Sequence, residues 1–170
     1  DGDGYGNSAL STQSCSQPSG YVSDSNDCDD GDSSQNPVAM EYCNGEDDNC
    51  DGVVDEDSSV DAGTYYQDGD GDGYGNSAMT TQSCGQPSGF TTDNTDCDDS
   101  DANQNPVASE YCNGEDDNCD GVVDEDSAVD AGTYFEDGDG DSYGDPYSSL
   151  VSCSQPSGFT TDNTDCDDSD

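Results

Sequence analysis

The stretch at residues 68–75 alternates aspartate with glycine before a tyrosine and a final glycine. In a calcium loop, carboxylates at positions 1, 3 and 5, glycine at 6 and a backbone carbonyl at 7 surround one cation. The three aspartates, the third glycine and the tyrosine carbonyl take these positions. Without a cation the carboxylates would repel one another. The spacing therefore predicts a bound hard divalent cation.

This first motif nearly recurs at residues 137–144 and, truncated, at residues 1–6. Position 9 holds Asn76, or Asp145 in the third copy, and both offer oxygen. Met79 stands at position 12, where an EF-hand has glutamate, so a distant carboxylate or water must finish the shell. The predicted ligands of the first motif are Asp1, Asp3, Tyr5, Asn7, Asp68, Asp70, Asp72, Tyr74, Asn76, Asp137, Asp139, Asp141, Tyr143 and Asp145.

A second acidic motif occupies residues 116–125 and recurs at residues 47–56. It again places oxygen-bearing side chains at positions 1, 3, 5 and 9, with glycine at 6 and a valine carbonyl at 7. Position 12 is Ser127, so Glu125 or a residue of another loop provides the bidentate carboxylate. The predicted ligands are Asp47, Asn49, Asp51, Val53, Asp55, Glu56, Asp116, Asn118, Asp120, Val122, Asp124 and Glu125.

A third motif, at residues 96–101, is followed by Glu110 on a predicted short helix. Its spacing fits no numbered calcium loop, and a solvated acidic turn is the alternative interpretation. The predicted ligands are Asp27, Asp29, Glu41, Asp96, Asp98, Glu110, Asp165 and Asp167.

The composition excludes several classes of protein. The 170 residues include 43 acids and no Lys, Arg or His, for a formal charge of −43, and hydrophobic residues make up 26%. No side chain can form a salt bridge, so compensating charge must come from solution or from bound metal. Such numbers alone suit an acidic disordered tail. A polyanion should avoid nucleic acid and anionic membranes, and no apolar run approaches the roughly 20 residues of a membrane span.

A 69-residue repeat argues against disorder. Cys15, Cys84 and Cys153 are each 69 residues apart, and residues 1–69 match residues 70–138 at 54 of 69 positions without insertion. We therefore divide the chain into repeat units at 1–69, 70–138 and 139–170. Because both ends fall inside acidic motifs, we expect a segment of a longer array.

The sequence predicts small irregular tandem repeats stabilised by calcium and disulfides, forming an extended rod or filament. Short strands are expected at residues 64–67 and 90–92, and a polar connection at residues 77–88. Pro106 is expected to start one or two helical turns that end at Cys112. No segment shows sustained helical or alternating periodicity.

Ten cysteines indicate an oxidising compartment. No CxxC pair occurs, which disfavours zinc. Four cysteines per unit allow three pairings, and we favour the local one. It comprises Cys15–Cys28, Cys43–Cys50, Cys84–Cys97, Cys112–Cys119 and Cys153–Cys166.

Together these motifs resemble the MopE-type metal-binding repeat of secreted and surface proteins of bacteria. The resemblance rests on Asp68–Gly75, Cys84–Phe90, Asp96–Asp99 and Glu110–Gly121, and covers essentially the whole chain. It implies an extracellular, calcium-loaded, disulfide-bonded module, similar in principle to thrombospondin type 3 repeats. The copper binding of the type protein does not carry over, because this chain has no His or Trp and two Met.

We expect an extracellular or cell-surface structural protein, a rod, stalk or fibre that binds about three Ca²⁺ per unit and joins further copies of the repeat end to end. A calcium-dependent adhesin or a module that binds glycans or minerals is the alternative. An enzyme is not expected, since basic side chains are missing and nothing indicates a pocket that separates carboxylate pKa values. Frequent Ser and Thr favour O-glycosylation.

Overall fold

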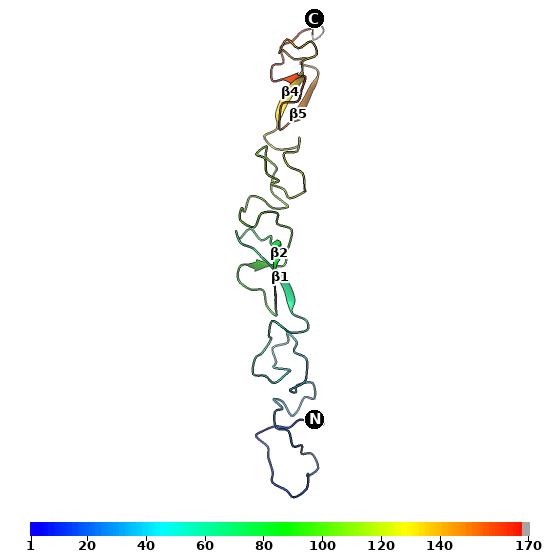
Figure 1. Cartoon of the computed structure of the whole chain (residues 1–170), viewed down its shortest axis with the longest axis vertical. Helices are drawn as coiled ribbons and strands as arrows, with labels where there is room; N and C mark the ends of the chain where they lie inside the picture. The colour runs from blue at the N-terminus through cyan, green and yellow to red at the C-terminus, as the bar shows by residue number, and fades with distance from the viewer. Residues whose placement is uncertain (168–170) are drawn as a thin grey trace. The chain divides into compact units, whose positions relative to one another are not determined.

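The computed structural model describes residues 1–167. The chain divides into two compact units, which interleave along the sequence. Residues 1–67 and 78–92 make up the first unit; residues 68–77 and the chain from residue 93 onward make up the second. Apart from six short strands, the described residues lie in turns, bends and irregular segments (Figure 1).

Two small antiparallel sheets have an aromatic strand at their centre. In the first sheet β1 (Gly63–Gln67) lies between β2 (Asn76–Ser83) and β3 (Phe90–Thr91), and Tyr66 pairs with Thr91. In the second, β4 (Gly132–Glu136) lies between β5 (Ser149–Ser152) and β6 (Phe159–Thr160). Threonine and aromatic residues favour strands, and the strands expected at residues 64–67 and 90–92 are confirmed. The polar connection expected at residues 77–88 differs from expectation, because its first seven residues belong to β2.

The predicted helix from Pro106 to Cys112 is wrong, and residues 1–167 contain no helix. The carbonyl of Asn105 accepts a hydrogen bond from Ala108 N–H at 2.9 Å, while its side-chain oxygen accepts one from Val107 N–H at 3.1 Å. Asparagine thereby closes a single turn with its own side chain, a local bond that competes with helix continuation. No helix in this part of the chain has the length and apolarity that crossing a membrane requires.

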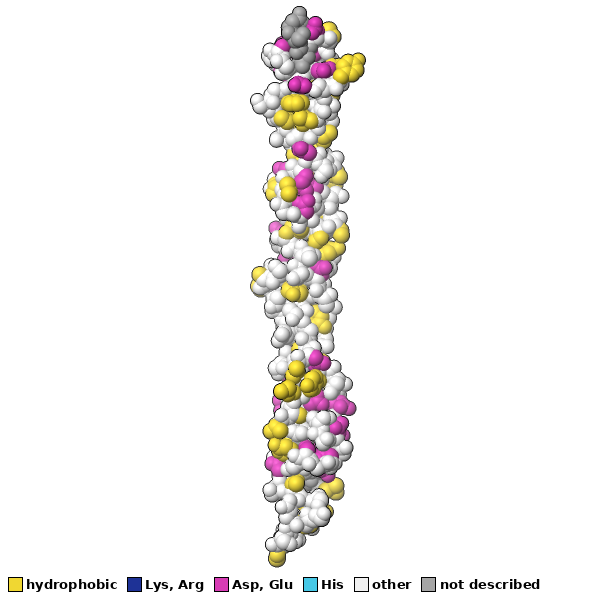
Figure 2. Space-filling view, turned by 90° about the vertical axis from the view of Figure 1, so that its right-hand side faces the viewer, with side chains coloured by type: hydrophobic (Ala, Val, Ile, Leu, Met, Phe, Trp, Pro, Cys, Tyr) yellow, Lys and Arg dark blue, Asp and Glu magenta, His cyan; other side chains and the backbone are white. Residues whose placement is uncertain are grey.

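The buried residues are almost all polar. Among the described residues Ala128 is the one buried hydrophobic side chain, at 7% exposure. On the face drawn in Figure 2, hydrophobic side chains are scattered, acidic ones are spread among them and no basic side chain is seen. The interior therefore consists of hydrogen-bonded carboxylates and amides. The buried polar residues are Asp27, Gln35, Asn36, Glu41, Asp48, Ser59, Gln104, Asn105, Glu110 and Asp117.

Four disulfides join cysteines 22 or 41 residues apart, so the predicted local pairing is wrong. The bonds are Cys28–Cys50, Cys43–Cys84, Cys97–Cys119 and Cys112–Cys153, while Cys15 and Cys166 are exposed free thiols.

Packing of the third motif against the second explains the 22-residue pairing. Cys28 Sγ lies 3.2 Å from the carbonyl oxygen of Asp47, and Cys97 Sγ lies 3.4 Å from that of Asp116. Cys28 and Cys97 therefore pack against the first residue of a second motif. The cysteine at the fourth position of that motif is their disulfide partner. Sequence spacing alone could not show that these two loops pack together.

Removing a bond of either class should destabilise the chain. Through the unfolded state, a crosslink spanning 22 residues contributes about 3 kcal/mol and one spanning 41 about 4 kcal/mol. We expect the double variants Cys97→Ala/Cys119→Ala and Cys112→Ala/Cys153→Ala to lose stability by these amounts in urea unfolding. Peptide mapping without reduction should recover the four bonds, and recovery of Cys43 joined to Cys50 would contradict this connectivity.

Candidate metal centre

The first motif gathers its carboxylates in all three copies. In each group the ligand oxygens of the three residues lie within 4.8 Å of one another. Like charges at this spacing repel one another, and a bound cation would relieve the repulsion. The groups are Asp1 with Asp3 and Asp27, Asp68 with Asp70 and Asp72, and Asp137 with Asp139 and Asp141.

Hydrogen bonds from the backbone hold these carboxylates in place. Asp70 Oδ1 accepts a hydrogen bond from Asp72 N–H at 3.2 Å, and Asp72 Oδ1 accepts one from Tyr74 N–H at 2.9 Å. The intervening Gly73 has φ +98°, which glycine adopts without strain. Each aspartate uses one oxygen to shape the loop, and Asp70 Oδ2 is buried without a hydrogen-bond partner.

The electrostatics of the first motif disfavour negative charge. Burial raises the pKa of Asp70, and the neighbouring charges of Asp72, Asp68 and Asp99 add to the increase. In the third copy the hydrogen bond from Asp141 N–H lowers the pKa of Asp139, but burial and nearby carboxylates raise it overall. A bound cation would relieve this penalty directly.

The second motif is organised around Glu110, which is 6% exposed. Its Oε2 accepts a hydrogen bond from Asn118 N–H at 3.2 Å, and its Oε1 accepts one from Asp124 N–H at 3.1 Å. Within the loop, Asp116 accepts hydrogen bonds from Asp120 N–H at 3.1 Å and Gly121 N–H at 2.9 Å. Glu41 accepts the corresponding bonds from Asn49 and Asp55 in the first copy.

Carboxyl groups meet directly inside the second motif. Those of Glu110 and Asp120 approach Glu125 within hydrogen-bonding reach. Burial and the charge of Glu125 raise the pKa of Glu110. Hydrogen bonds from its own backbone and from Asn118 lower the pKa of Glu125, whose Oε2 is buried without a partner. A buried carboxylate beside a half-buried one is stabilised by a shared proton or by a cation between them.

Backbone strain occurs at two residues of this motif. Cys119 and Asp124 have φ values of +57° and +56°, and Cys50 and Asp55 repeat them in the first copy. Such angles are uncommon outside glycine and are maintained by surrounding contacts. The disulfide to Cys97 holds Cys119, while Glu110 accepts the hydrogen bond from Asp124 N–H.

The third motif contributes only part of its predicted ligand set to one place. Asp96 lies near Asp70 and Asp72. Burial is the main cause that raises the pKa of Asp96, and the charges of these two aspartates add to it. Asp98 is exposed, and its Oδ1 accepts hydrogen bonds from the N–H and the hydroxyl of Ser100. Glu110 lies against the second motif instead. Asp29 and Glu41 repeat the positions of Asp98 and Glu110, and Asp167 of the last copy is also exposed.

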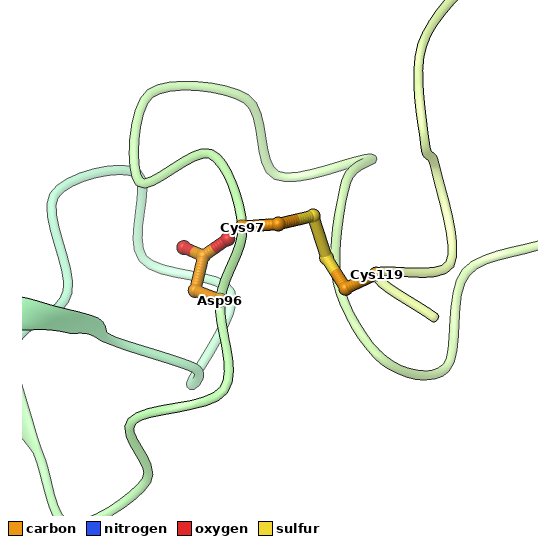
Figure 3. A group of neighbouring side chains, drawn as sticks. All are labelled: Asp96, Cys97 and Cys119. Carbon is orange, nitrogen blue, oxygen red and sulfur yellow. A yellow bond between two sulfur atoms is a disulfide. The ribbon is translucent and has the colours of Figure 1, made fainter. Parts of the chain in front are cut away.

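One acidic group is not a metal site. Asp96 lies beside the sulfur atoms of Cys97 and Cys119, but these are joined in a disulfide, as Figure 3 shows. Sulfur binds a metal as a thiolate, and the sulfurs of a disulfide are not thiolates. The Asp96 carboxylate is therefore available to the first motif.

The residues at position 9 shape turns. Asn7 and Asp145 accept hydrogen bonds from the N–H groups of Ala9 and Tyr147. Asp124 accepts one from Gly114 N–H at 2.8 Å, and Asp55 does the same for Gly45.

Sequence reasoning missed Asp117, which is 5% exposed and accepts hydrogen bonds from Tyr111 N–H and the Asn113 side chain. Asp48 repeats this role at the same exposure in the first copy. No spacing signal distinguished these aspartates from their acidic neighbours.

Comparison with protein families finds two matches to Cu-binding_MopE, described as "putative metal-binding motif", at residues 27–56 and 96–125. Two 30-residue segments of the chain are therefore similar to this metal-binding motif. The expected resemblance is confirmed for these two segments, and each of them runs from the start of the third motif to the end of the second. Comparison with curated proteins and with solved structures finds no match.

The donors of the MopE-type motif fit a hard cation better than copper. Carboxylate, amide and carbonyl oxygens suit Ca²⁺ and Mg²⁺, whereas copper prefers imidazole, thiolate and thioether. The chain has no His, eight cysteines are in disulfides, and Met40 and Met79 are 66% and 53% exposed. The motif and the acidic groups together indicate metal binding.

Acid should stabilise the metal-free chain. The pKa values of Asp70, Asp96 and Glu110 are raised, so the folded chain binds more protons than the unfolded one as the pH falls through those values. The stabilisation is complete below the ordinary carboxylate pKa and is lost as the pH rises through the raised values. We expect a higher urea midpoint at about pH 4.5 than at pH 7 without metal, and the reverse in calcium, because protons compete with the cation. Equal midpoints without metal would contradict this prediction.

Proposed function

We propose that this chain is an extracellular structural protein whose repeats bind Ca²⁺ and form a rigid rod, stalk or fibre. The observation that carries the proposal is the placement of the buried Glu110 carboxylate beside Glu125, whose Oε2 is buried without a partner, in a chain without a basic side chain. Only a proton or a cation from solution can compensate these carboxylates. At neutral pH and millimolar extracellular calcium, the cation is the more available partner.

The choice of calcium rests on ligand number and geometry. The second motif offers carboxylates from two separate segments and a loop shaped by backbone hydrogen bonds, which suits the six to eight oxygens that Ca²⁺ accepts. Mg²⁺ demands a near-ideal octahedron and keeps several waters. The irregular and partly buried arrangement around Glu110 therefore favours the larger ion.

An extracellular location is supported by the disulfides. Four bonds persist only where thiols are oxidised. They also suit a chain in which burial of polar residues replaces an apolar core. The exposed hydroxyls of Ser58, Thr92 and Thr161 offer positions for O-linked sugars, which would shield the backbone of such a chain.

The structural role is supported by the register of the repeat. A 69-residue period without insertion keeps every acidic motif and every paired cysteine at a fixed interval. Bonds that span 41 residues tie the segment just before a second motif to the next repeat, as Cys43 is tied to Cys84. Repeats that contact only their neighbours form elongated arrays.

Calcium should determine the fold of the chain. A cation that binds only the folded state adds about 2.7 kcal/mol per site at a hundredfold excess over its dissociation constant. We expect chelation to lower the urea midpoint and to change the small-angle scattering profile, and added calcium to restore both. Scattering profiles that superimpose with and without chelator would contradict the structural proposal.

A variant can separate calcium binding from general charge effects. Glu110→Gln removes one carboxylate charge at the second motif, so calcium binding there should weaken at least about tenfold, because affinity depends on the charge of the ligands. Asp126→Asn is the matched control, since Asp126 is exposed and lies outside the acidic groups. Isothermal titration should show loss of one high-affinity site in the first variant and none in the control.

A further inference from the structure

Asp27 is the most buried aspartate beside a first motif. It is 6% exposed, and one of its oxygens lies within 4.8 Å of oxygens of Asp1 and Asp3. Its Oδ1 accepts a hydrogen bond from Asp29 N–H at 2.9 Å, whereas its Oδ2 is buried without any partner. Asp3 Oδ2 is buried and unpartnered as well. Two buried anionic oxygens in one small group, with no donor facing either, require a ligand that supplies positive charge.

The same arrangement occurs at the second copy of the loop. Asp70 Oδ2 and Asp96 Oδ2 are both buried without a partner. The pKa of Asp96 is raised mainly by burial. The charges of Asp72, Asp70 and Asp99 raise it further. Asp99 also lies at this place, because its Oδ1 accepts a hydrogen bond from Gly69 N–H at 2.6 Å.

The third copy of the loop also has a buried aspartate oxygen beside it. Asp165 Oδ2 is buried without a partner. The charge of Asp165 is also one of those that raise the pKa of Asp139 in the neighbouring loop.

A backbone hydrogen bond brings the two segments together in every copy. The N–H groups of Asp27, Asp96 and Asp165 donate to the carbonyls of Gly6, Gly75 and Gly144, at 3.2, 3.3 and 3.2 Å. Each bond closes a connection of about 20 residues. The aspartate side chain is thereby placed beside the loop.

We propose that each first motif and the aspartate that starts the third motif form one composite cation site, completed by Asp27, Asp96 or Asp165. The matched MopE-type segments begin at Asp27 and Asp96 and leave the loop outside. The composite site is therefore distinct from the one around Glu110, and rests on the proposed function only for the identity of the cation, Ca²⁺. One ion there closes the connection between loop and aspartate.

The composite site changes the number of ions expected. If the three acidic motifs bound separately, the chain would hold eight ions: three at first motifs, two at second motifs and three at third motifs. Merging the first and third motifs leaves three composite sites and two second-motif sites. We expect five Ca²⁺ per chain by native mass spectrometry with the disulfides intact, and eight would overturn the proposal.

Asp96→Asn tests the ligand directly. The amide keeps an oxygen for Asp98 N–H, which donates to Asp96 Oδ1 at 2.9 Å, but loses the charge. We expect the ion count to fall from five to four, or calcium affinity at one site to fall at least about tenfold. Exchange of the Asp96 N–H, slowed by calcium in the unmodified chain, should stay fast. Asp165→Asn should give the same loss in the third copy, which keeps the test valid if one variant folds poorly.

The controls separate this proposal from the proposed function. Asp126→Asn changes the same charge at an exposed position and should leave five ions bound, whereas Glu110→Gln should remove an ion without affecting exchange at Asp96. Five ions and unchanged affinity in both Asp96→Asn and Asp165→Asn would overturn the composite site while leaving calcium binding intact. No calcium bound by the unmodified chain would overturn both.

Discussion

Negative charge without a positive side chain is the constraint on which the rest of the structure depends. A formal charge of −43 is distributed over 170 residues, and neither Lys, Arg nor His is present to pair with it. The chain nevertheless places Glu110, Glu41 and Asp27 at 6% exposure instead of leaving them in water. Burial of a carboxylate is costly unless the group is hydrogen-bonded and its charge is compensated. Backbone N–H groups meet the first need, and a cation from solution would meet the second.

Carboxylates perform the task that apolar side chains perform in most domains. Glu110 accepts hydrogen bonds from two backbone N–H groups of the second motif, and Asp117 accepts one from Tyr111 and others from Asn113. These bonds fix a backbone that forms no helix and little sheet within residues 1–167. Charge-assisted hydrogen bonds are stronger than neutral ones, but only while the carboxylate stays ionised. The stability of the interior at neutral pH thus depends on how well a cation compensates the charge of its carboxylates.

Disulfides and acidic motifs are coupled in space. The Cys97–Cys119 bond joins the residue after Asp96 to the fourth position of the second motif, so a single crosslink connects the regions around both kinds of acidic group. Cys119 adopts its left-handed φ of +57° at this junction. The repeat reproduces the arrangement with Cys28 and Cys50 at the same separation of 22 residues. Oxidation and cation binding therefore act on the same loops.

Much of the candidate site could be predicted from the sequence, because it depends on neighbours in the chain. Alternate aspartates bond to backbone N–H groups two residues ahead, and glycine permits the positive φ between them, so the loop at residues 68–74 follows from local chemistry. Strand β1 (Gly63–Gln67) likewise follows from threonine and aromatic residues. The prediction of a helix after Pro106 was wrong for a local reason as well, since the side chain of Asn105 closes a single turn there.

Tertiary structure alone decided which distant segments meet. The sequence shows four cysteines per repeat and a glutamate after the third motif, but not that Cys97 meets Cys119 or that Glu110 lies against the second motif. It also does not distinguish Asp117, which is buried, from the exposed Asp126. Such choices depend on the free energy of closing connections of about 20 to 40 residues, which burial and crosslinking compensate only in the assembled chain. Residue types and spacing specified the chemistry of each loop, and the packing of one loop on another specified its partners.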